Sequence, residues 1–241
     1  MSLTSVNANL KILCITHSDF DLGPHIASWI KNQQHTLTYC RPFQGQSFPS
    51  LDEFDWLILT GGTQCLLEKK QYTFLLDEID FVKRAIASNK IVLGFCLGAQ
   101  IIGESYGQET ELSPYQEVGA FPIELTLAGK NDPILKDLPQ SLTVAHWHKY
   151  MPGITKTATI LATSAGCPRQ IIRYSPKTYG FQCHPELCLQ DVEKAISLFY
   201  EQLPAGPYIQ AKEEFLGSDF SSMNHIVVLI LNRLAQLKNS K

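Results

Sequence analysis

Short apolar segments alternate with longer helical patterns in the N-terminal part of the chain. Continuous apolar runs occupy residues 11–16, 35–40, 55–62 and 90–95. Residues 72–88, between the last two runs, place large apolar side chains three or four positions apart, which is typical of an amphipathic helix. Strands of parallel sheets are buried on both faces and therefore read as continuous apolar runs. This alternation predicts βαβ units around a mostly parallel sheet.

The pattern changes after Tyr106, where shorter runs and many turn residues begin. A second long helix is expected at about 189–203, because the Pro/Gly cluster at 204–207 stops it. Residues 208–241 carry helical signals again, although the many β-branched side chains in 225–237 lower the helix propensity there. The shorter runs predict further strands, several of them antiparallel, at residues 121–127, 141–148, 157–163, 169–175 and 178–184.

Together these elements predict an α/β fold with a doubly wound, flavodoxin-like central sheet that is mostly parallel and has helices on both faces. A small antiparallel sheet and a C-terminal helical tail are expected beside it. We expect one domain over residues 1–241, with its core at about 11–203 and the tail at about 208–241. The tail is too short to form a hydrophobic core of its own.

Composition limits the function further. Lys and Arg total 20 against 23 Asp and Glu, and no basic run exceeds Lys69-Lys70, so a small-molecule substrate is favoured over nucleic acid. The seven cysteines are an odd number without a CxxC pair, which fits reduced thiols in a cytoplasmic protein. No secretory signal opens the sequence, and its most apolar stretch, 226–231, is too short to span a bilayer, so no membrane is expected.

The segment from Lys90 to Gly103 contains the strongest chemical signal. An apolar strand ends near Gly94, Cys96 follows, and an apolar helix begins near Gly98. A sharp strand-to-helix turn of this kind exposes a nucleophile and needs small flanking residues. The turn also places the sulfur at a helix N-terminus, which favours the thiolate. The alternative is a buried, inert cysteine, but that alternative explains neither glycine.

A thiolate nucleophile needs a base and a group that orients the base. His184 ends an expected strand, and Glu186 follows Pro185, so both side chains project to the same side of an extended chain. We expect a rigid His–carboxylate pair, against the alternative of a surface or core imidazole without a catalytic role. His146 and His148 form another close pair, but no third ligand stands at a usual offset, so no metal is expected.

Acyl chemistry also needs donors for a developing oxyanion. The backbone N–H of Leu97, directly after the nucleophile, is one candidate. The second is Gly62, with Gly61 beside it, in the T-G-G-T stretch that follows an apolar run. The alternative for this stretch is a plain tight turn.

These motifs resemble those of the class I glutamine amidotransferases, whose elbow reads G-x-C-x-G-x-Q. Here the elbow is Gly94 to Gln100, the family's H-P-E is His184 to Glu186, and its glycine-rich loop is Thr60 to Gly62. The resemblance covers about residues 11–203. Within the family, the chain is most similar to the glutaminase domain of GMP synthase and its stand-alone relatives, through the H-W-H stretch and the helical tail.

The resemblance implies a Cys96–His184–Glu186 triad that hydrolyses glutamine through a γ-glutamyl thioester, without a cofactor. It also implies that Gly61, Gln100, Trp147, Lys149 and Tyr150 contact the substrate. More weakly, the resemblance also implies that residues 117–119 lie near the substrate. The GMP synthase-like subgroup usually has a His-Gly-Asp-like tract where this sequence has His148-Lys149-Tyr150. This difference affects the expected contacts with glutamine and leaves the expected triad unchanged.

The acceptor of the ammonia is open, because no G-x-x-x-x-G-K-[ST] phosphate loop is present. Either a separate synthetase subunit docks here or the enzyme acts alone, and the apolar tail leaves a homodimer open. One alternative keeps the triad but acts on a γ-glutamyl peptide or polyamine conjugate. Another is a non-catalytic scaffold or regulatory protein of the same fold.

Overall fold

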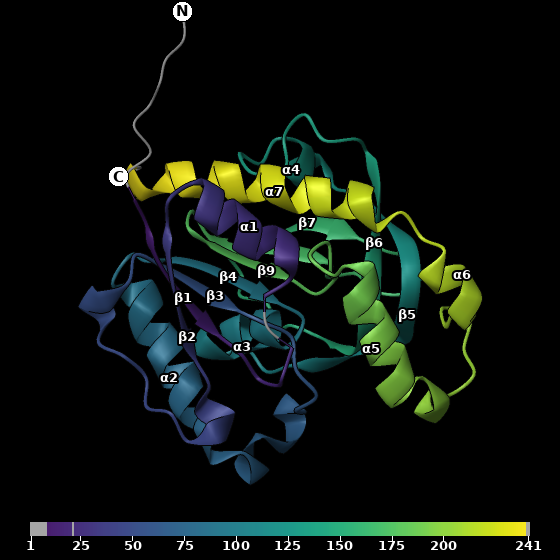
Figure 1. The fold of residues 1–241 in the computed structure, drawn as a ribbon, viewed down its shortest axis with the longest axis horizontal. Coiled ribbons are helices and arrows are strands. Elements are labelled where there is room, and N and C mark those ends of the chain that lie inside the picture. The colour runs from purple at the N-terminus through teal and green to yellow at the C-terminus, as the bar shows by residue number, and fades with distance from the viewer. Residues whose placement is uncertain (1–8, 21, 240–241) are drawn as a thin grey trace, which may run out of the picture.

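The computed structural model describes residues 9–20 and 22–239. Within these residues one nine-stranded sheet has the order β2-β1-β3-β4-β9-β8-β7-β5-β6 (Figure 1). Its strands are β1 Lys11–Ile15, β2 Thr36–Cys40, β3 Trp56–Leu59, β4 Ile91–Phe95, β5 Glu111–Leu125, β6 Ser141–Met151, β7 Thr159–Thr163, β8 Ile171–Ser175 and β9 Thr178–Phe181.

The strands β2, β1, β3, β4 and β9 all pair in parallel. Every residue of β3, β4 and β9 is buried, because these strands lie in the middle of the sheet with both faces covered. The predicted parallel core is therefore confirmed, and its continuous apolar runs have the expected cause.

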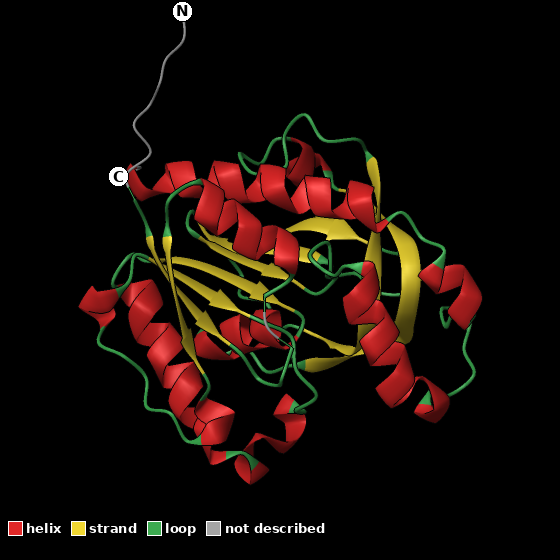
Figure 2. Cartoon of the chain, in the orientation of Figure 1, coloured by secondary structure: helices red, strands yellow, loops and turns green. Residues whose placement is uncertain are grey.

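Helices cover both faces of this parallel part (Figure 2). Ile12 of β1 packs in the same core as residues of α1 (Pro24–Asn32) and α7 (Phe220–Gln236). Leu13, the next residue, packs on the other face with residues of α2 (Thr73–Ala87) and α3 (Leu97–Ser105). Neighbouring strand residues point to opposite faces, so one apolar run supplies two cores.

The expectations of a mostly parallel central sheet and of a separate small antiparallel sheet are wrong, because one mixed sheet contains both the parallel and the antiparallel strands. β9 pairs in parallel with β4 along one edge and antiparallel with β8 along the other. β7, β5 and β6 then continue antiparallel from β8, and the short helix α4 (Leu127–Lys130) lies between β5 and β6 in the chain. The apolar runs of the sequence cannot reveal that the two parts form one sheet, because the strands that join them, β4 and β9, are far apart in the sequence.

The C-terminal part is helical, as expected. α5 covers Leu189–Phe199, shorter than the expected 189–203, since a 3-10 turn at Tyr200–Gln202 replaces its last residues. α6 (Lys212–Leu216) and α7 follow. The β-branched residues of α7 form a helix because tertiary burial outweighs their low propensity: its buried side chains include Val227 and Ile230, which pack in the core with α1. The single-domain organisation stays a prediction.

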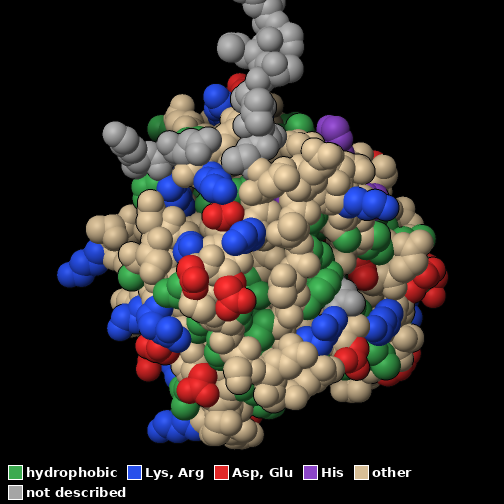
Figure 3. Space-filling view, turned by 60° about the vertical axis from the view of Figure 1, so that its left-hand side comes forward, with side chains coloured by type: hydrophobic (Ala, Val, Ile, Leu, Met, Phe, Trp, Pro, Cys, Tyr) green, Lys and Arg blue, Asp and Glu red, His purple; other side chains and the backbone are tan. Residues whose placement is uncertain are grey.

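The surface carries charges of both signs. In Figure 3, Lys and Arg side chains are mixed with Asp and Glu side chains over the visible face. None of the helices formed by the described residues combines the length and apolarity needed to cross a bilayer.

Candidate active site

Cys96 lies in the turn between β4 and α3, at the carboxyl end of the parallel sheet. Its backbone has φ +49° and ψ −106°, a strained conformation for a residue other than glycine. Its N–H donates to the carbonyl oxygen of Phe181 at 2.7 Å, which ties the turn to β9. The predicted sharp elbow is therefore present, with the cysteine as the cap of α3.

The two glycines of the elbow are required by close approach. A Cβ on Gly94 would lie 2.4 Å from the carbonyl of Gly98, and a Cβ on Gly98 would lie 2.5 Å from the carbonyl oxygen of Leu59. Both distances are well inside van der Waals contact. The small residues therefore let α3 pack directly on β3 and β4.

Glu186 holds the imidazole of His184 in place. Nδ1 of His184 lies 2.6 Å from Oε1 of Glu186, and both residues are buried. The N–H of His184 donates to the carbonyl oxygen of Ala145 at 2.7 Å, which fixes the segment after β9 against β6. The expected contact between the imidazole and the carboxylate is present. It uses Nδ1 of His184, so Nε2 of the same ring is available for another partner.

The protonation of His184 depends on both neighbours. Burial alone lowers the pKa of His184, but the Glu186 carboxylate and a hydrogen bond with Cys96 together raise it to about 10. The imidazolium form is therefore favoured at neutral pH. A thiolate beside an imidazolium is a competent nucleophile with a proton donor next to it.

The site opens into a cavity of about 390 Å³. Of the residues expected at the site, Gly61, Gly62, Cys96, Trp147, His184 and Glu186 line it. The carbonyl oxygen of Trp147 lies 3.8 Å from Sγ of Cys96. The rest of the lining is Ser18, Phe20, Leu22, Gly23, Thr60, Thr63, Phe95, Leu187, Asp191, Ala195, Phe199, Gln202 and Leu203. The sequence did not point to the apolar members, which are scattered along the chain without a motif.

Other residues expected to contact substrate lie outside this lining. Gln100 is buried, and its Nε2 donates to Oε1 of Gln182 at 3.1 Å. Lys149 is exposed, with Nζ 5.8 Å from the ring centroid of Tyr150. A hydrogen bond with Cys65 and partial burial raise the pKa of Tyr150 to about 12. The side chain of Leu97 is buried, and its backbone N–H lies in the first turn of α3, directly after Cys96.

The glycine loop after β3 reaches the elbow. A Cβ on Gly61 would lie 3.3 Å from Cε1 of His184 and 3.6 Å from Cβ of Cys96. Beneath the loop, Nδ1 of His17 lies 3.0 Å from the carbonyl oxygen of Thr60. His17 was not expected from the sequence, although a polar residue that closely follows the apolar run of β1 lies at the same edge of the sheet as the nucleophile.

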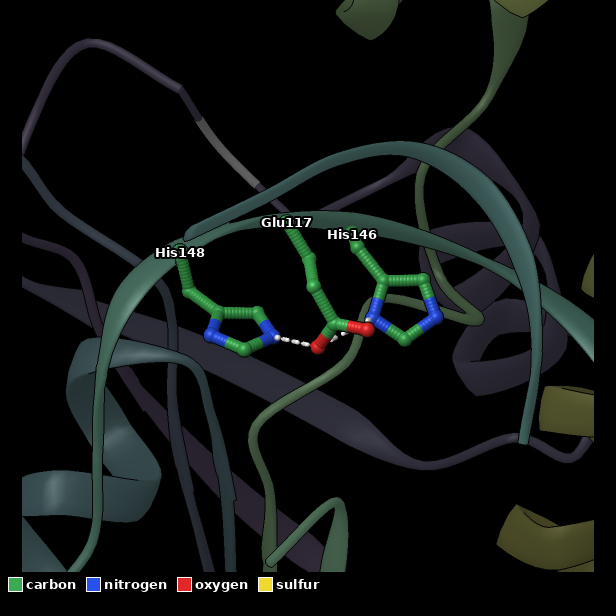
Figure 4. Close-up of side chains that lie close together, drawn as sticks. All are labelled: Glu117, His146 and His148. Atoms are coloured by element: carbon green, nitrogen blue, oxygen red, sulfur yellow. Dashed lines mark ion pairs between the residues drawn. The ribbon is translucent and has the colours of Figure 1, made fainter. Parts of the chain in front are cut away.

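A second buried polar cluster lies on β5 and β6, where Glu117, His146 and His148 converge (Figure 4). Oε2 of Glu117 lies 3.1 Å from Nε2 of His148 and 3.7 Å from Nδ1 of His146. The expectation that the two histidines lack a third partner is wrong, because strand pairing places Glu117 opposite His148. Alternation along β6 turns both histidines to the face opposite Trp147.

This cluster has ligand types that a divalent metal accepts, with ligand atoms within 4.8 Å of one another. The same space is used by Gln170, whose Nε2 donates to Oε2 of Glu117 at 2.6 Å. Burial raises the pKa of Glu117, but a hydrogen bond from His148 and the charges of both histidines lower it overall. Burial lowers the pKa of His146 to about 3. The cluster is therefore a buried hydrogen-bond network around an ionised carboxylate, in which Nδ1 of His148 and Oε1 of Gln170 have no partner among the described residues.

Comparison with known proteins identifies the family. The model of the class I glutamine amidotransferases matches residues 29–200. The chain belongs to this family. The glutamine amidotransferase-like protein YfeJ of Salmonella typhimurium is 33% identical over 239 residues, covering 96% of this chain and all of that protein. The solved structure of SMU.1228c superposes with a TM-score of 0.87 at 38% identity, covering 93% of this chain and 99% of that one.

The likeness to GMP synthase is more distant. One component of the glutamine-hydrolysing GMP synthase of Methanococcus maripaludis is 33% identical over 107 residues, covering 43% of this chain and 54% of that component. The family assignment rests on residues 29–200 and on a relative that covers 96% of the chain, whereas the GMP synthase likeness covers 43% of it.

Proposed function

We propose that this amidotransferase-family chain hydrolyses a γ-glutamyl amide, with glutamine as the reference substrate, through a thioester on Cys96. The observation that carries the proposal is the strained cysteine at the start of α3, which lines one cavity with an imidazole whose Nδ1 lies 2.6 Å from Oε1 of Glu186. Each of the three groups has a defined place in acyl transfer.

In this mechanism Sγ of Cys96 attacks the side-chain carbonyl carbon of the substrate. The backbone N–H groups of Leu97 and Gly62 donate to the oxyanion. His184 gives its Nε2 proton to the departing nitrogen as the C–N bond breaks, and ammonia leaves. His184 then takes a proton from water, whose oxygen attacks the thioester, and the thiolate is released with glutamate. Glu186 orients the imidazole throughout.

The substrate contacts divide into two groups. Gly61 and Trp147 line the cavity and are proposed to touch the glutamyl part directly. Gln100, Lys149 and Tyr150 lie outside the lining, so direct contact for them stays a prediction from resemblance. The acceptor of the ammonia, a homodimer, a cytoplasmic location and docking of a separate synthetase also stay predictions.

A second candidate is hydrolysis of a γ-glutamyl amide whose nitrogen carries a substituent. The cavity volume of about 390 Å³ favours it, because pockets of this size hold ligands larger than a free amino acid. A non-catalytic scaffold is less well supported, since strain at a backbone position such as that of Cys96 is typical of functional sites.

The test is release of glutamate and ammonia from glutamine by the purified chain. Cys96→Ser should abolish turnover, whereas Cys40→Ser should keep it. Cys40 is a suitable control because it is buried on β2, away from the cavity, and burial raises its pKa to about 11. Equal turnover by Cys96→Ser and the unchanged protein would exclude the proposed nucleophile.

A further inference from the structure

The cavity has two chemically different sides, and strand order determines which part of a substrate meets each side. The glycine loop follows β3, on one side of β4, and His184 and α5 follow β9, on the other. The proposed oxyanion donor at Gly62 therefore lies on the first side, and the donor at Leu97 follows β4 itself. Because His184 protonates the leaving nitrogen, the amine must depart on the α5 side.

On that side Leu187, Ala195, Phe199 and Leu203 line the cavity as an apolar wall, and Phe20 and Leu22 from the segment after β1 complete it. The segment after β1 closes against α5: Nζ of Lys194 lies 4.1 Å from the ring centroid of Phe20 and donates to the carbonyl oxygen of Asp19. A Cβ on Gly23 would lie 2.7 Å from the carbonyl oxygen of Glu186, so this segment also reaches the residues after His184. Ammonia alone gains nothing from such a wall.

The charged residues at the cavity also favour an uncharged leaving group. Its described lining contains no Lys or Arg, and its carboxylates are Glu186 and Asp191. Oε1 of Glu186 pairs with His184, Oε2 of Glu186 is buried without a partner among the described residues, and Asp191 accepts from the N–H of Cys188 at 3.0 Å. A leaving group with its own carboxylate would be repelled, and a cationic one would compete with partners already in place. An uncharged apolar group matches the wall without either cost.

We propose that the preferred substrates are γ-glutamyl amides whose nitrogen carries an uncharged apolar substituent, up to about the size of a benzyl group. This inference rests on the proposed function, because it uses the same thioester. The C–S bond forms as the C–N bond breaks, the proton of His184 goes to the nitrogen, and the free amine leaves. Water supplies the hydroxyl group of the released glutamate and returns a proton to His184, and Cys96 leaves as the thiolate.

The experiment compares kcat/KM for glutamine, γ-glutamyl ethylamide, γ-glutamyl benzylamide, γ-glutamyl putrescine and γ-glutamylglutamate. We expect a rise of about fourfold for each buried methylene, and at least about tenfold for benzylamide over glutamine. The putrescine and glutamate conjugates should not exceed the ethylamide. Equal or higher kcat/KM for glutamine than for benzylamide overturns the inference, and so does preference for putrescine or glutamate.

Variants on α5 test the location. Phe199→Ser should lower the ratio of benzylamide to glutamine turnover at least about fivefold, by loss of apolar contact. Ala195→Leu, which fills the cavity instead, should also lower it. Leu198→Ser is the matched control, because Leu198 is half exposed and does not line the cavity. An unchanged ratio in both folded variants contradicts the assignment of this wall.

Failure of the inference is distinguishable from failure of the proposed function. Turnover of glutamine without any gain for benzylamide overturns only the apolar preference. Absence of turnover with every substrate, together with absence of Cys96 labelling by a glutamine-like chloroketone, overturns the function itself.

Discussion

Nε2 of His17 lies 2.9 Å from Oε1 of Glu78, and both side chains are fully buried beneath the glycine loop. The other ring nitrogen of His17 faces the carbonyl oxygen of Thr60. Nε2 of Gln64 donates a hydrogen bond to the backbone carbonyl oxygen of His17 at 2.8 Å. The side chains of His17, Glu78 and Gln64, none of which lines the cavity, thus form a polar network that supports the loop carrying the proposed oxyanion donor.

Loss of this support should lower kcat more than it raises KM. Glu78→Ala leaves a buried imidazole without its carboxylate and lets the loop shift, which should reduce kcat about 10- to 100-fold. Glu78→Gln keeps an acceptor for His17 and should restore most of the rate. Asp80→Ala, on the exposed face of the same helix, is the control. Equal rates for Glu78→Ala and Asp80→Ala would show that the network does not position the loop.

The elbow glycines should tolerate no side chain. In Gly98→Ala the new methyl group would overlap the carbonyl oxygen of Leu59, so the free energy of unfolding should fall by about 1–3 kcal/mol. Gly206→Ala, where the nearest atom is 3.3 Å away on a flexible Ile209 side chain, should change it far less. Urea unfolding of both variants measures the difference, and equal midpoints would contradict the packing described.

The pH dependence of turnover follows from the raised pKa of His184. Below about pH 10 the imidazole is protonated and can give its proton to the leaving nitrogen, and above that value it cannot. Turnover should therefore decline as the pH rises through about 10. Glu186→Gln removes the charge that raises this pKa, so the decline should begin at lower pH with kcat reduced at least about tenfold. An alkaline limb that does not move in Glu186→Gln would argue against the ion pair.

The buried cluster on β5 and β6 predicts a pH-dependent stability. The folded pKa of Glu117 is lowered, so its carboxylate stabilises the fold fully above the unfolded value of about 4.3 and loses this contribution as pH falls through the folded value. Glu117→Gln should thus be less stable than the unchanged protein at pH 7 by about 1–3 kcal/mol. Urea unfolding at pH 7 and pH 3 checks this, and a gap that is as large at pH 3 as at pH 7 would contradict it.

Local sequence patterns predicted the parts of the fold and site that depend on neighbouring residues. The elbow around Cys96 and the contact between His184 and Glu186 are set by residues close in sequence, and both geometries are present. The continuity of the sheet and the partner of His146 depend on pairings between distant segments, so local patterns could not supply them. The same holds for the apolar cavity wall, whose members share no spacing.

The substrate contacts were the least predictable part. Gln100 matches the family motif by position, yet its side chain is turned toward Gln182 inside the protein. Lys149 and Trp147 lie two residues apart on β6 and so point to the same face, yet Lys149 is exposed while Trp147 lines the cavity. A motif gives the identity of a residue, whereas packing against distant elements decides where its side chain points.

The central claim is that Cys96 is the nucleophile that accepts the γ-glutamyl group. The most direct measurement is peptide mapping by mass spectrometry after treatment with a glutamine-like chloroketone, with and without excess glutamine. We expect one adduct per chain, located on Cys96, absent in His184→Ala and suppressed by glutamine. An adduct spread over the other cysteines, or a Cys96 that stays unmodified while glutamine is turned over, would contradict it.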